Sequence, residues 1–417
     1  IIQYSAFIIQ HSSFAMKTIL LISPYWKEAH RWMVSSVKLA ELWQRLGYRV
    51  VVACMGDEKA KSPSTELRTG SKQNANQEES LRSSSFAFSP EDVSPTLRIY
   101  RKKDIFLKDP WNYGICFGFS GLVRRIVAEE KPDVIVVNKV LFWTSLSILS
   151  LKLRGIRAML ITDALVGITW WPRGFIPRIA AAIYAWALGW LVLASAESVT
   201  FFHPQPAHIL ARLGIAKKSS VIPTGIDPGP YEKTKNENRK ANEVTITYIG
   251  RLESIKGVDD FLAAIAPLKQ QYPDITIQVV GHYEAGHPLV QQYQREVSFP
   301  GLRNDIPAIL AKTDIFVMPS HSEGLSNAIM EAMASSCACI ASDVGGNRYL
   351  LQNGVSGFLF PVGDREALAS HVRRLIEDAP KRAALGKAAR ERIEKEFSWE
   401  IVGERYKKLF EQLIIEN

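Results

Sequence analysis

The stretch 319–346, PSHSEGLSNAIMEAMASSCACIASDVGG, decides the fold of this chain. It follows the apolar run 315–318, IFVM, which is typical of a parallel strand buried on both faces. A short polar turn containing Gly324 comes next, and a helical pattern begins near Ala328. A strand, a glycine-containing turn and a helix N-terminus together form an anion-binding arrangement. We therefore expect an α/β fold with a ligand-binding turn after this strand.

Two glutamates flank the turn, eight residues apart. Glu323 lies in the turn, and Glu331 lies about one and a half turns into the predicted helix. A carboxylate at that depth can accept hydrogen bonds from a ribose diol. The alternative for Glu331 is an exposed helix glutamate, which is the commonest environment for this residue type. The backbone N–H groups and the helix dipole offer positive charge to an anion, and the donors expected in the turn are Gly324, Leu325, Ser326 and Asn327.

A chain of 417 residues is too long for one ordinary core, so we expect two domains. Strand and helix patterns alternate twice, which predicts two Rossmann-like, doubly wound domains facing each other across a cleft. A polar linker is expected near 231–242. The predicted boundaries are 16–225 for the first domain, with a flexible insertion at 57–97, 226–397 for the second domain, and 398–417 for a helix that packs back on the first domain.

In the second half, further polar and glycine residues follow predicted strands. Gly250 and Arg251 end the first of these strands, and Lys256 follows five residues after Arg251. Glycine lets backbone approach a ligand, while Arg and Lys both bind phosphate oxygens. Gly281 ends the next strand, IQVVG. Because ligands of open α/β sheets bind beyond the carboxyl ends of strands, these residues are candidates for binding a diphosphate.

Charge is spread unevenly along the chain. Residues 1–225 contain 28 Lys and Arg against 16 Asp and Glu, whereas residues 226–417 contain 23 against 26. A basic first half favours an anionic partner such as a lipid headgroup or a phosphate, and the alternative is an ordinary solvated basic surface. Nucleic acid is the least favoured partner because no recognised binding motif accompanies the charge.

An uncharged run, 179–196, occupies the middle of the first half. Its length permits a transmembrane span, but its alanine content and its position inside a predicted domain favour a helix that is buried on the sheet or lies partly in a membrane surface. The run has Arg173 and Arg178 before it. Tryptophans lie in or beside the run at Trp170, Trp171, Trp186 and Trp190. Peripheral contact with an anionic membrane is therefore an expectation.

Chemistry in the first half is expected at Asp163. This residue follows the buried strand pattern 157–162, so it lies where ligands bind in such sheets, although an Asx turn or a helix cap is the alternative. The four cysteines form no CxxC pair, which favours a reducing, cytoplasmic environment. We expect the native chain to start at Met16 rather than to carry a signal peptide, because 1–15 lacks a basic start and a clear cleavage site.

Several motifs of the second half occur in one recognisable order. They are GRLxxxKG at 250–257, VVG at 279–281, VxFxG at 297–301, the stretch 319–334, DVGG at 343–346 and NGxxGFLFP at 353–361. In this order the chain resembles glycosyltransferase family 4, the retaining transferases of the GT-B fold. The first half resembles the family more loosely, through MKTILLISP at 16–24 and VIPTGID at 221–227.

The resemblance implies that the first domain, 16–225, binds the acceptor and that the second, 226–397, binds the nucleotide sugar. It also implies roles for the matching residues. Arg251 and Lys256 would hold the diphosphate of a nucleotide-sugar donor, Glu331 would hold its ribose, and Glu323 would lie at the sugar and assist catalysis. Val297 and Phe299 would border the nucleobase. Such enzymes need no metal or other cofactor, and the chain contains no Asp-x-Asp pair. The departing phosphate is thought to deprotonate the acceptor, which would be a lipid-linked or cell-surface glycan.

The first half departs from the family in two places. The residues 24–30, PYWKEAH, replace a Gly-Gly loop, and Thr162 stands where a histidine often precedes Asp163. His30 could contribute to acceptor binding, although a surface histidine is the simpler interpretation. Two other functions stay open at this stage: a non-catalytic nucleotide-sugar-binding protein, and a nucleotide-sugar epimerase of the same architecture. The intact Glu323 and Glu331 pattern favours the transferase.

Overall fold

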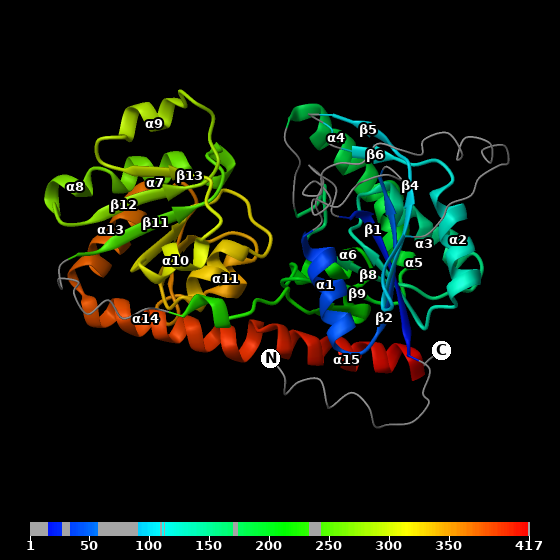
Figure 1. Ribbon diagram of the computed structural model, residues 1–417. Coiled ribbons are helices and arrows are strands. Elements are labelled where there is room, and N and C mark those ends of the chain that lie inside the picture. The colour runs from blue at the N-terminus through cyan, green and yellow to red at the C-terminus, as the bar shows by residue number, and fades with distance from the viewer. Residues whose placement is uncertain are drawn as a thin grey trace, which may run out of the picture.

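The structure is a computed structural model, and it describes residues 16–26, 34–56, 91–108, 111, 113–169, 174–232 and 243–415. The described chain forms two α/β domains, each built on its own sheet (Figure 1). Residues 1–15, His30, Trp170, Trp171 and Arg173 lie outside the described residues, so the predictions that concern them stay predictions.

The sheet of the first domain has eight strands, in the order β10-β9-β8-β7-β1-β2-β4-β3. All its pairings are parallel except that of β3 with β4. Its central strands are rich in Val, Ile and Leu because helices cover both faces. The strands are β1 (Thr18–Tyr25), β2 (Arg49–Met55), β3 (Glu91–Ser94), β4 (Leu97–Lys102), β7 (Val134–Asn138), β8 (Met159–Thr162), β9 (Val199–Phe201) and β10 (Ser219–Val221).

The second domain has a six-stranded, all-parallel sheet in the order β13-β12-β11-β14-β15-β16. The chain runs outward from β11 to β12 and β13, then returns to the other side of β11 for β14. The strands β11 and β14 therefore flank a topological switch point, where open α/β sheets bind ligands. The strands are β11 (Thr245–Ile249), β12 (Thr276–Val280), β13 (Ser298–Gly301), β14 (Ile315–Met318), β15 (Ala338–Ser342) and β16 (Phe358–Phe360).

Helices cover both sheets (Figure 1). In the first domain they are α1 (Val34–Arg45), α2 (Phe119–Glu130), α3 (Ser147–Lys152), α4 (Phe175–Tyr184), α5 (Trp190–Ser195) and α6 (Ala207–Arg212). In the second domain they are α7 (Val258–Ile265), α8 (Leu268–Gln271), α9 (Pro288–Tyr293), α10 (Ile306–Ala311), α11 (Asn327–Ala334), α12 (Asn347–Leu350), α13 (Arg365–Glu377) and α14 (Ala379–Arg392). The last helix, α15 (Trp399–Ile415), follows α14 through the π-helical turn η8 (Ile393–Phe397).

The structure corrects one predicted boundary and adds two local features. The flexible insertion was expected to reach residue 97, but β3 and the start of β4 lie in the sheet, and only 57–90 falls outside the described residues. The segment 258–271 forms two helices, α7 and α8, rather than one, because Pro267 cannot donate an N–H to the preceding turn. The basic and aromatic segment after β4 contains a hairpin of β5 (Ile105–Leu107) and β6 (Tyr113–Ile115), which the sequence analysis missed.

The last helix returns to the first domain (Figure 1). Tyr406 and Phe410 on α15 pack edge-to-face against Trp43 on α1, with ring centroids 5.8 and 5.3 Å apart. The two chain crossings between the domains also run side by side, because Ile226 N–H bonds to the Phe397 carbonyl at 2.9 Å. The domains are thus joined at paired crossings, and the last helix belongs to the core of the first domain.

Candidate active site

The loops after β11 and β14 meet at the switch point of the second sheet. Lys256 lies at the end of the turn after β11, in η7 (Ser254–Lys256), and Glu323 lies in the turn after β14. Their side chains form an ion pair, with Lys256 Nζ 2.7 Å from Glu323 Oε1. The Ser320 hydroxyl donates to the same oxygen at 2.9 Å. The structure therefore brings together two residues that are 67 positions apart and that the sequence analysis had assigned to one site.

Further contacts fix the Glu323 turn against the Lys256 turn. The His321 N–H bonds to the Ile255 carbonyl at 2.9 Å, and the His321 Nε2 lies 2.6 Å from Asp260 Oδ2 on α7. Arg365 binds the other oxygen of Asp260 at 2.7 Å. These contacts tie the backbone of one turn to the other, so the Lys256–Glu323 pair rests on rigid elements.

Two glycines permit the close packing of these turns. Gly257 has φ +68°, and a Cβ there would lie 1.9 Å from the Pro319 carbonyl oxygen. Gly345 has φ +44°, and its Cβ would lie 1.9 Å from the Glu323 carbonyl oxygen. Both positions need glycine because other residues are disfavoured at positive φ and because a side chain would collide with the backbone of the Glu323 turn.

The Glu323 turn leads directly into α11. Ser326 caps this helix, since its hydroxyl accepts from the Ile329 N–H at 3.4 Å. The first N–H groups of a helix have no acceptor within the helix, and the helix dipole adds partial positive charge at this end. The start of α11, beside Lys256, is therefore a place where a phosphate group would be stabilised.

Glu331 lies in the second turn of α11 and is partly buried. Burial raises the pKa of its carboxyl, against the opposing effects of Lys38 and of a hydrogen bond from the Tyr231 hydroxyl. Tyr231 belongs to η6 (Gly229–Tyr231), in the crossing between the domains, and Lys38 belongs to α1 of the first domain. Glu331 is therefore not the freely exposed helix residue of the alternative interpretation.

The other residues predicted to bind the donor differ in how accessible they are to a ligand. Arg251 pairs with Glu253 at 2.9 Å and its side chain is 64% exposed. Gly281 follows β12, and its N–H bonds to the Gly301 carbonyl at 3.0 Å. Val297 is buried in the hydrophobic core at 3% exposure, so its side chain is not available to a nucleobase. Phe299 is half-buried and packs edge-to-face on Tyr283, with centroids 6.2 Å apart.

In the first domain, polar residues follow three neighbouring strands. Asp163 follows β8, Lys139 follows β7, and His203 follows β9. Lys139 Nζ lies 2.7 Å from Asp163 Oδ2. Burial disfavours the charged carboxylate, but the Lys139 ammonium outweighs this effect and holds the pKa of Asp163 below its usual value. Burial lowers the pKa of His203, so its imidazole is neutral near pH 7.

The backbone at Lys139 has a left-handed conformation, with φ +74°. A non-glycine residue rarely adopts this conformation, and such strain often marks functional sites. The Lys139 N–H bonds to the Ile161 carbonyl at 2.7 Å, which anchors the residue to the neighbouring strand. The sequence analysis missed Lys139 and His203. Their position after predicted strands was the one signal that could have found them.

The two groups of residues meet between the domains. A Cβ on Gly324 would lie 3.9 Å from the Asp163 Cβ, so the Glu323 turn faces Asp163. The Leu325 side chain packs against the core clusters of both domains. The predicted donor residues of the second domain thus lie opposite the one residue predicted for chemistry in the first.

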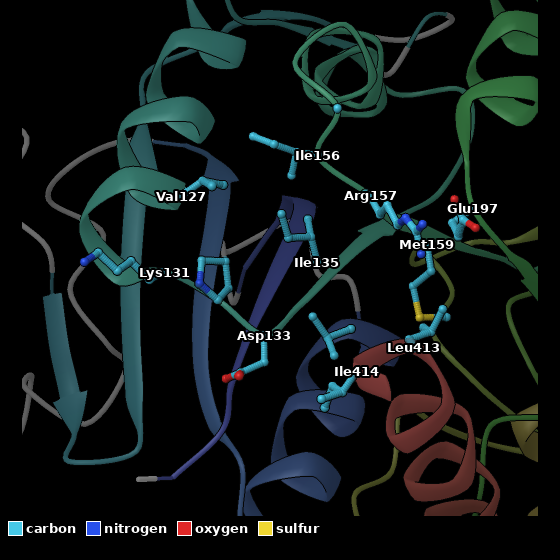
Figure 2. Close-up of a pocket in the computed structure, with 14 residues that line it drawn as sticks. Val127, Lys131, Asp133, Ile135, Ile156, Arg157, Met159, Glu197, Leu413 and Ile414 are labelled. Atoms are coloured by element: carbon cyan, nitrogen blue, oxygen red, sulfur yellow. The ribbon is translucent and has the colours of Figure 1, made fainter. Parts of the chain in front are cut away.

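A separate cavity of about 410 Å³ lies at the opposite edge of the first sheet (Figure 2). Asp133 and Arg157, which precede β7 and β8, lie on its wall with Leu413 and Ile414 of α15. It opens at the amino ends of these strands, whereas Lys139 and Asp163 follow their carboxyl ends. This cavity is therefore remote from the candidate site.

Comparison with known proteins places the chain in a family. Residues 34–229 match the family described as Glycosyltransferase Family 4, and residues 243–378 match Glycosyl transferases group 1. The chain belongs to glycosyltransferase family 4. The chain is 32% identical over 177 residues to an Escherichia coli UDP-Gal:alpha-D-GlcNAc-diphosphoundecaprenol alpha-1,3-galactosyltransferase, a match that covers 39% of this chain and 46% of the relative.

Solved structures agree with the fold. A sucrose-phosphate synthase from Thermosynechococcus elongatus has a TM-score of 0.72 at 21% identity, over 96% of this chain and all of the other. Anabaena HepE in complex with UDP has a TM-score of 0.70 at 18% identity, over 95% and 100%. The expected GT-B fold is confirmed. The chain's matches span about half the length of the curated relatives, so its activity is argued below as a proposal.

Proposed function

We propose that this glycosyltransferase family 4 protein transfers a sugar, with retention of configuration, from a nucleoside diphosphate sugar to an acceptor. One observation carries the proposal: the Lys256–Glu323 ion pair lies at the topological switch point, beside the start of α11. A cation, a helix N-terminus and a carboxylate at one point are what binding a diphosphate and an adjacent sugar requires. The printed names of its relatives, which include a UDP-galactose-dependent transferase and a protein bound to UDP, support the same donor class.

The proposed reaction breaks the bond between the anomeric carbon and the diphosphate and forms a bond to the acceptor oxygen. The acceptor proton passes to the departing diphosphate. Lys256, Arg251 and the dipole of α11 would stabilise the negative charge of the leaving group, which is the task that a metal ion serves in other transferases. Glu323 would hold the sugar in position, and Glu331 would accept hydrogen bonds from the ribose.

For the acceptor we propose a lipid-linked or cell-surface glycan. The named galactosyltransferase acts on a diphosphoundecaprenol-linked sugar, and the first half of the present chain is basic. The Asp163 carboxylate, ionised beside Lys139, would accept a hydrogen bond from a sugar hydroxyl at the junction of the domains. We further propose that the transferred sugar is a hexose. The protein would act in the cytoplasm and contact the membrane peripherally.

Release of nucleoside diphosphate from a panel of UDP-, GDP- and ADP-sugars tests the activity. The panel is first screened by thermal shift, because a bound donor raises the apparent stability. We expect one donor to bind and to release its diphosphate when a membrane extract supplies the acceptor. Binding without release or sugar transfer would favour the non-catalytic alternative, and formation of an epimeric nucleotide sugar would favour an epimerase.

Lys256→Met tests the placement of the diphosphate. Removing a charge that stabilises the leaving group should lower kcat by about 10²–10³-fold, as loss of an oxyanion-stabilising donor does. Lys407→Met removes an exposed lysine from α15 and serves as the matched control. Full activity in Lys256→Met, with the control unaffected, would contradict the assignment.

A further inference from the structure

The helical segment Phe175–Ser195 combines α4, the π-helical turn η4 (Ala185–Gly189) and α5, and it has one buried stripe. The stripe recurs at roughly one helical turn and consists of Pro177, Ala181, Ala185, Gly189, Val192 and Leu193. Its small residues let the segment lie close to the domain: a Cβ on Gly167 would come 2.3 Å from the Ala181 carbonyl oxygen. Because the stripe runs the whole length, the segment lies along the first domain.

The remaining surface of the segment is apolar and exposed. It is long and apolar enough to cross a membrane, with a mean hydropathy of 1.6 over 18 residues. Only 33% of those 18 residues are buried, whereas a core helix of a soluble domain is mostly buried. Arg178 is the one charged residue within 175–195. Its exposed large side chains are Phe175 (78%), Ile176 (65%), Ile179 (46%), Ile183 (64%), Trp186 (45%), Leu188 (42%), Trp190 (44%) and Leu191 (41%). An apolar patch of this kind marks an interaction surface rather than a core helix.

The β5–β6 hairpin lies beside α4 (Figure 1). The Tyr113 hydroxyl of β6 donates to the Leu141 carbonyl, and the Tyr184 hydroxyl of α4 donates to the adjacent Val140 carbonyl. The hairpin and the end of α4 are therefore neighbours. The hairpin also exposes apolar side chains, namely Ile105, Leu107 and Trp111. Lys103 and Lys108 flank β5, and both are exposed.

We propose that this surface, formed by Phe175–Ser195 and the β5–β6 hairpin, docks in the interface of an anionic lipid bilayer. Exposed Ile, Leu and Phe side chains would insert among the acyl chains, the tryptophans suit the headgroup level, and the two lysines attract anionic lipid. The buried stripe argues against a true span, because a span would have to leave the domain. The proposal commits to an anionic membrane rather than to a second copy, because the exposed Lys103 and Lys108 complement anionic headgroups, whereas a second copy would bring the same positive charges.

The surface is connected to the candidate active site. The segment that begins at Asp163 runs through Gly167, which packs on Ala181 of α4. The Leu165 N–H bonds to the Thr169 hydroxyl at 3.1 Å, which closes this short segment into a compact turn. Membrane docking would thus hold Asp163 near the bilayer, where a lipid-linked acceptor lies. Docking assigns a surface to the membrane contact of the proposed function, and the link to the acceptor rests on the proposed sugar transfer. Docking can be measured without any donor or acceptor.

Vesicle flotation of the full chain tests the docking. The probes are vesicles of phosphatidylcholine alone and vesicles with added phosphatidylglycerol, in the absence of any donor or acceptor. We expect flotation with the anionic vesicles, and at least a tenfold loss of binding in the double variant Ile179→Glu/Ile183→Glu. The matched control is Leu302→Glu/Val355→Glu, which places two glutamates on exposed apolar positions of the second domain and should float like the unmodified protein.

Several results would overturn the proposal. They are failure of the unmodified protein to float, equal binding to neutral and anionic vesicles, and undiminished flotation of the Ile179→Glu/Ile183→Glu variant. Sedimentation that shows a dimer of the unmodified protein and a monomer of this variant would assign the surface to a second copy. Resistance of the membrane-bound protein to carbonate extraction would indicate a span. A donor-induced thermal shift, measured in the same variants, verifies folding and tests the proposed function independently of docking.

Discussion

The carboxylate of Glu331 is partly buried in the second domain, and a lysine of the first domain influences it. Burial destabilises the charged form, and Lys38 and the Tyr231 hydroxyl oppose that effect only in part. A partly buried, ionised carboxylate lowers the stability of the folded protein when nearby hydrogen bonds and opposite charges do not replace its lost hydration. Such a cost is typical of a group kept for binding, because a ribose diol would supply the missing hydrogen bonds.

Glu331→Gln should therefore separate stability from donor binding. The pKa of Glu331 is raised in the folded state, so its protonation stabilises the fold and this stabilisation is lost as the pH rises through that pKa. At neutral pH the neutral glutamine should raise the melting temperature, and a gain of about 1 kcal/mol would correspond to about 2–4 °C. The donor-induced thermal shift should shrink in the same variant. A variant that is less stable and binds the donor normally would contradict both expectations.

The ion pair between Lys139 and Asp163 gives a prediction about pH. Lys139 holds the pKa of Asp163 below its usual value. Lys139→Met removes that effect, so the carboxyl should be protonated at higher pH. The acidic limb of kcat/KM should consequently move to higher pH, whereas Lys139→Arg, which keeps the positive charge, should restore the original limb. An unchanged limb in Lys139→Met would show that Asp163 is not required in its ionised form.

Sequence could predict the residues of the second domain because their chemistry is local. Glu323, Lys256 and Gly281 each follow a strand whose apolar pattern is unambiguous, and the switch-point rule places them together. Lys38, Tyr231 and Lys139 could not be predicted in the same way. Lys38 and Tyr231 reach Glu331 from other parts of the fold, and Lys139 is distinguished by its backbone conformation. The spacing of apolar residues in a sequence does not predict contacts between distant segments or a left-handed backbone conformation.

Among the elements, the paired turns after β11 and β14 are held together by backbone packing as well as by charge. Their separation is set where Gly257 lies against Pro319. Strands with a strong apolar pattern, such as β14 and β8, were predicted well from the sequence. The β5–β6 hairpin was not, because its strands have three residues each, which is too few to show a clear alternation or a buried apolar run.

Gly257→Ala should move these two turns apart. An added Cβ meets the Pro319 carbonyl oxygen in addition to the strain of a positive φ. Gly354→Ala is the matched control, because Gly354 has a similar φ of +79° but no atom within 4 Å of its Cβ position. The control should lose about 1–2 kcal/mol of unfolding free energy from φ alone. Gly257→Ala should lose more, and it should also weaken donor binding, as measured by denaturant unfolding and thermal shift.

Equal losses in the two alanine variants would show that the contact with Pro319 relaxes without cost. Normal donor affinity in Gly257→Ala, despite a larger loss of stability, would show that the spacing of the turns does not matter for binding. The comparison therefore tests whether the site depends on the close packing of its two turns.

At the scale of the whole molecule, the chain crosses between the domains twice at one place. The Ile226 N–H bonds to the Phe397 carbonyl, and the Trp399 N–H bonds to the Ile226 carbonyl. Because the two crossings are hydrogen-bonded to each other, the covalent connection between the domains is confined to one short region. A change of a few backbone angles in that region would let the domains move relative to each other. Glu331 and Lys38, on opposite domains, lie where such a movement would alter the candidate site.

The docking of α15 predicts that the two domains respond differently to one substitution. Phe410 is fully buried between Trp43 and Tyr406, although its helix follows the second domain in sequence. Phe410→Ala removes a large buried ring and should cost about 3–5 kcal/mol. This decrease in unfolding free energy should affect the first domain only. Nine of the ten tryptophans precede residue 226, so tryptophan fluorescence reports mainly on this domain.

In urea, the fluorescence transition of Phe410→Ala should therefore occur at a lower urea concentration. Circular dichroism reports on both domains, and the transition that a bound donor shifts belongs to the second domain. The midpoint of that second transition should not change. Ile415→Ala alters an 84% exposed residue of the same helix and should leave both transitions unchanged. A parallel shift of both transitions in Phe410→Ala would mean that the domains unfold as one cooperative unit. In that case the paired crossings and α15 transmit stability across the whole molecule rather than confining it to the first domain.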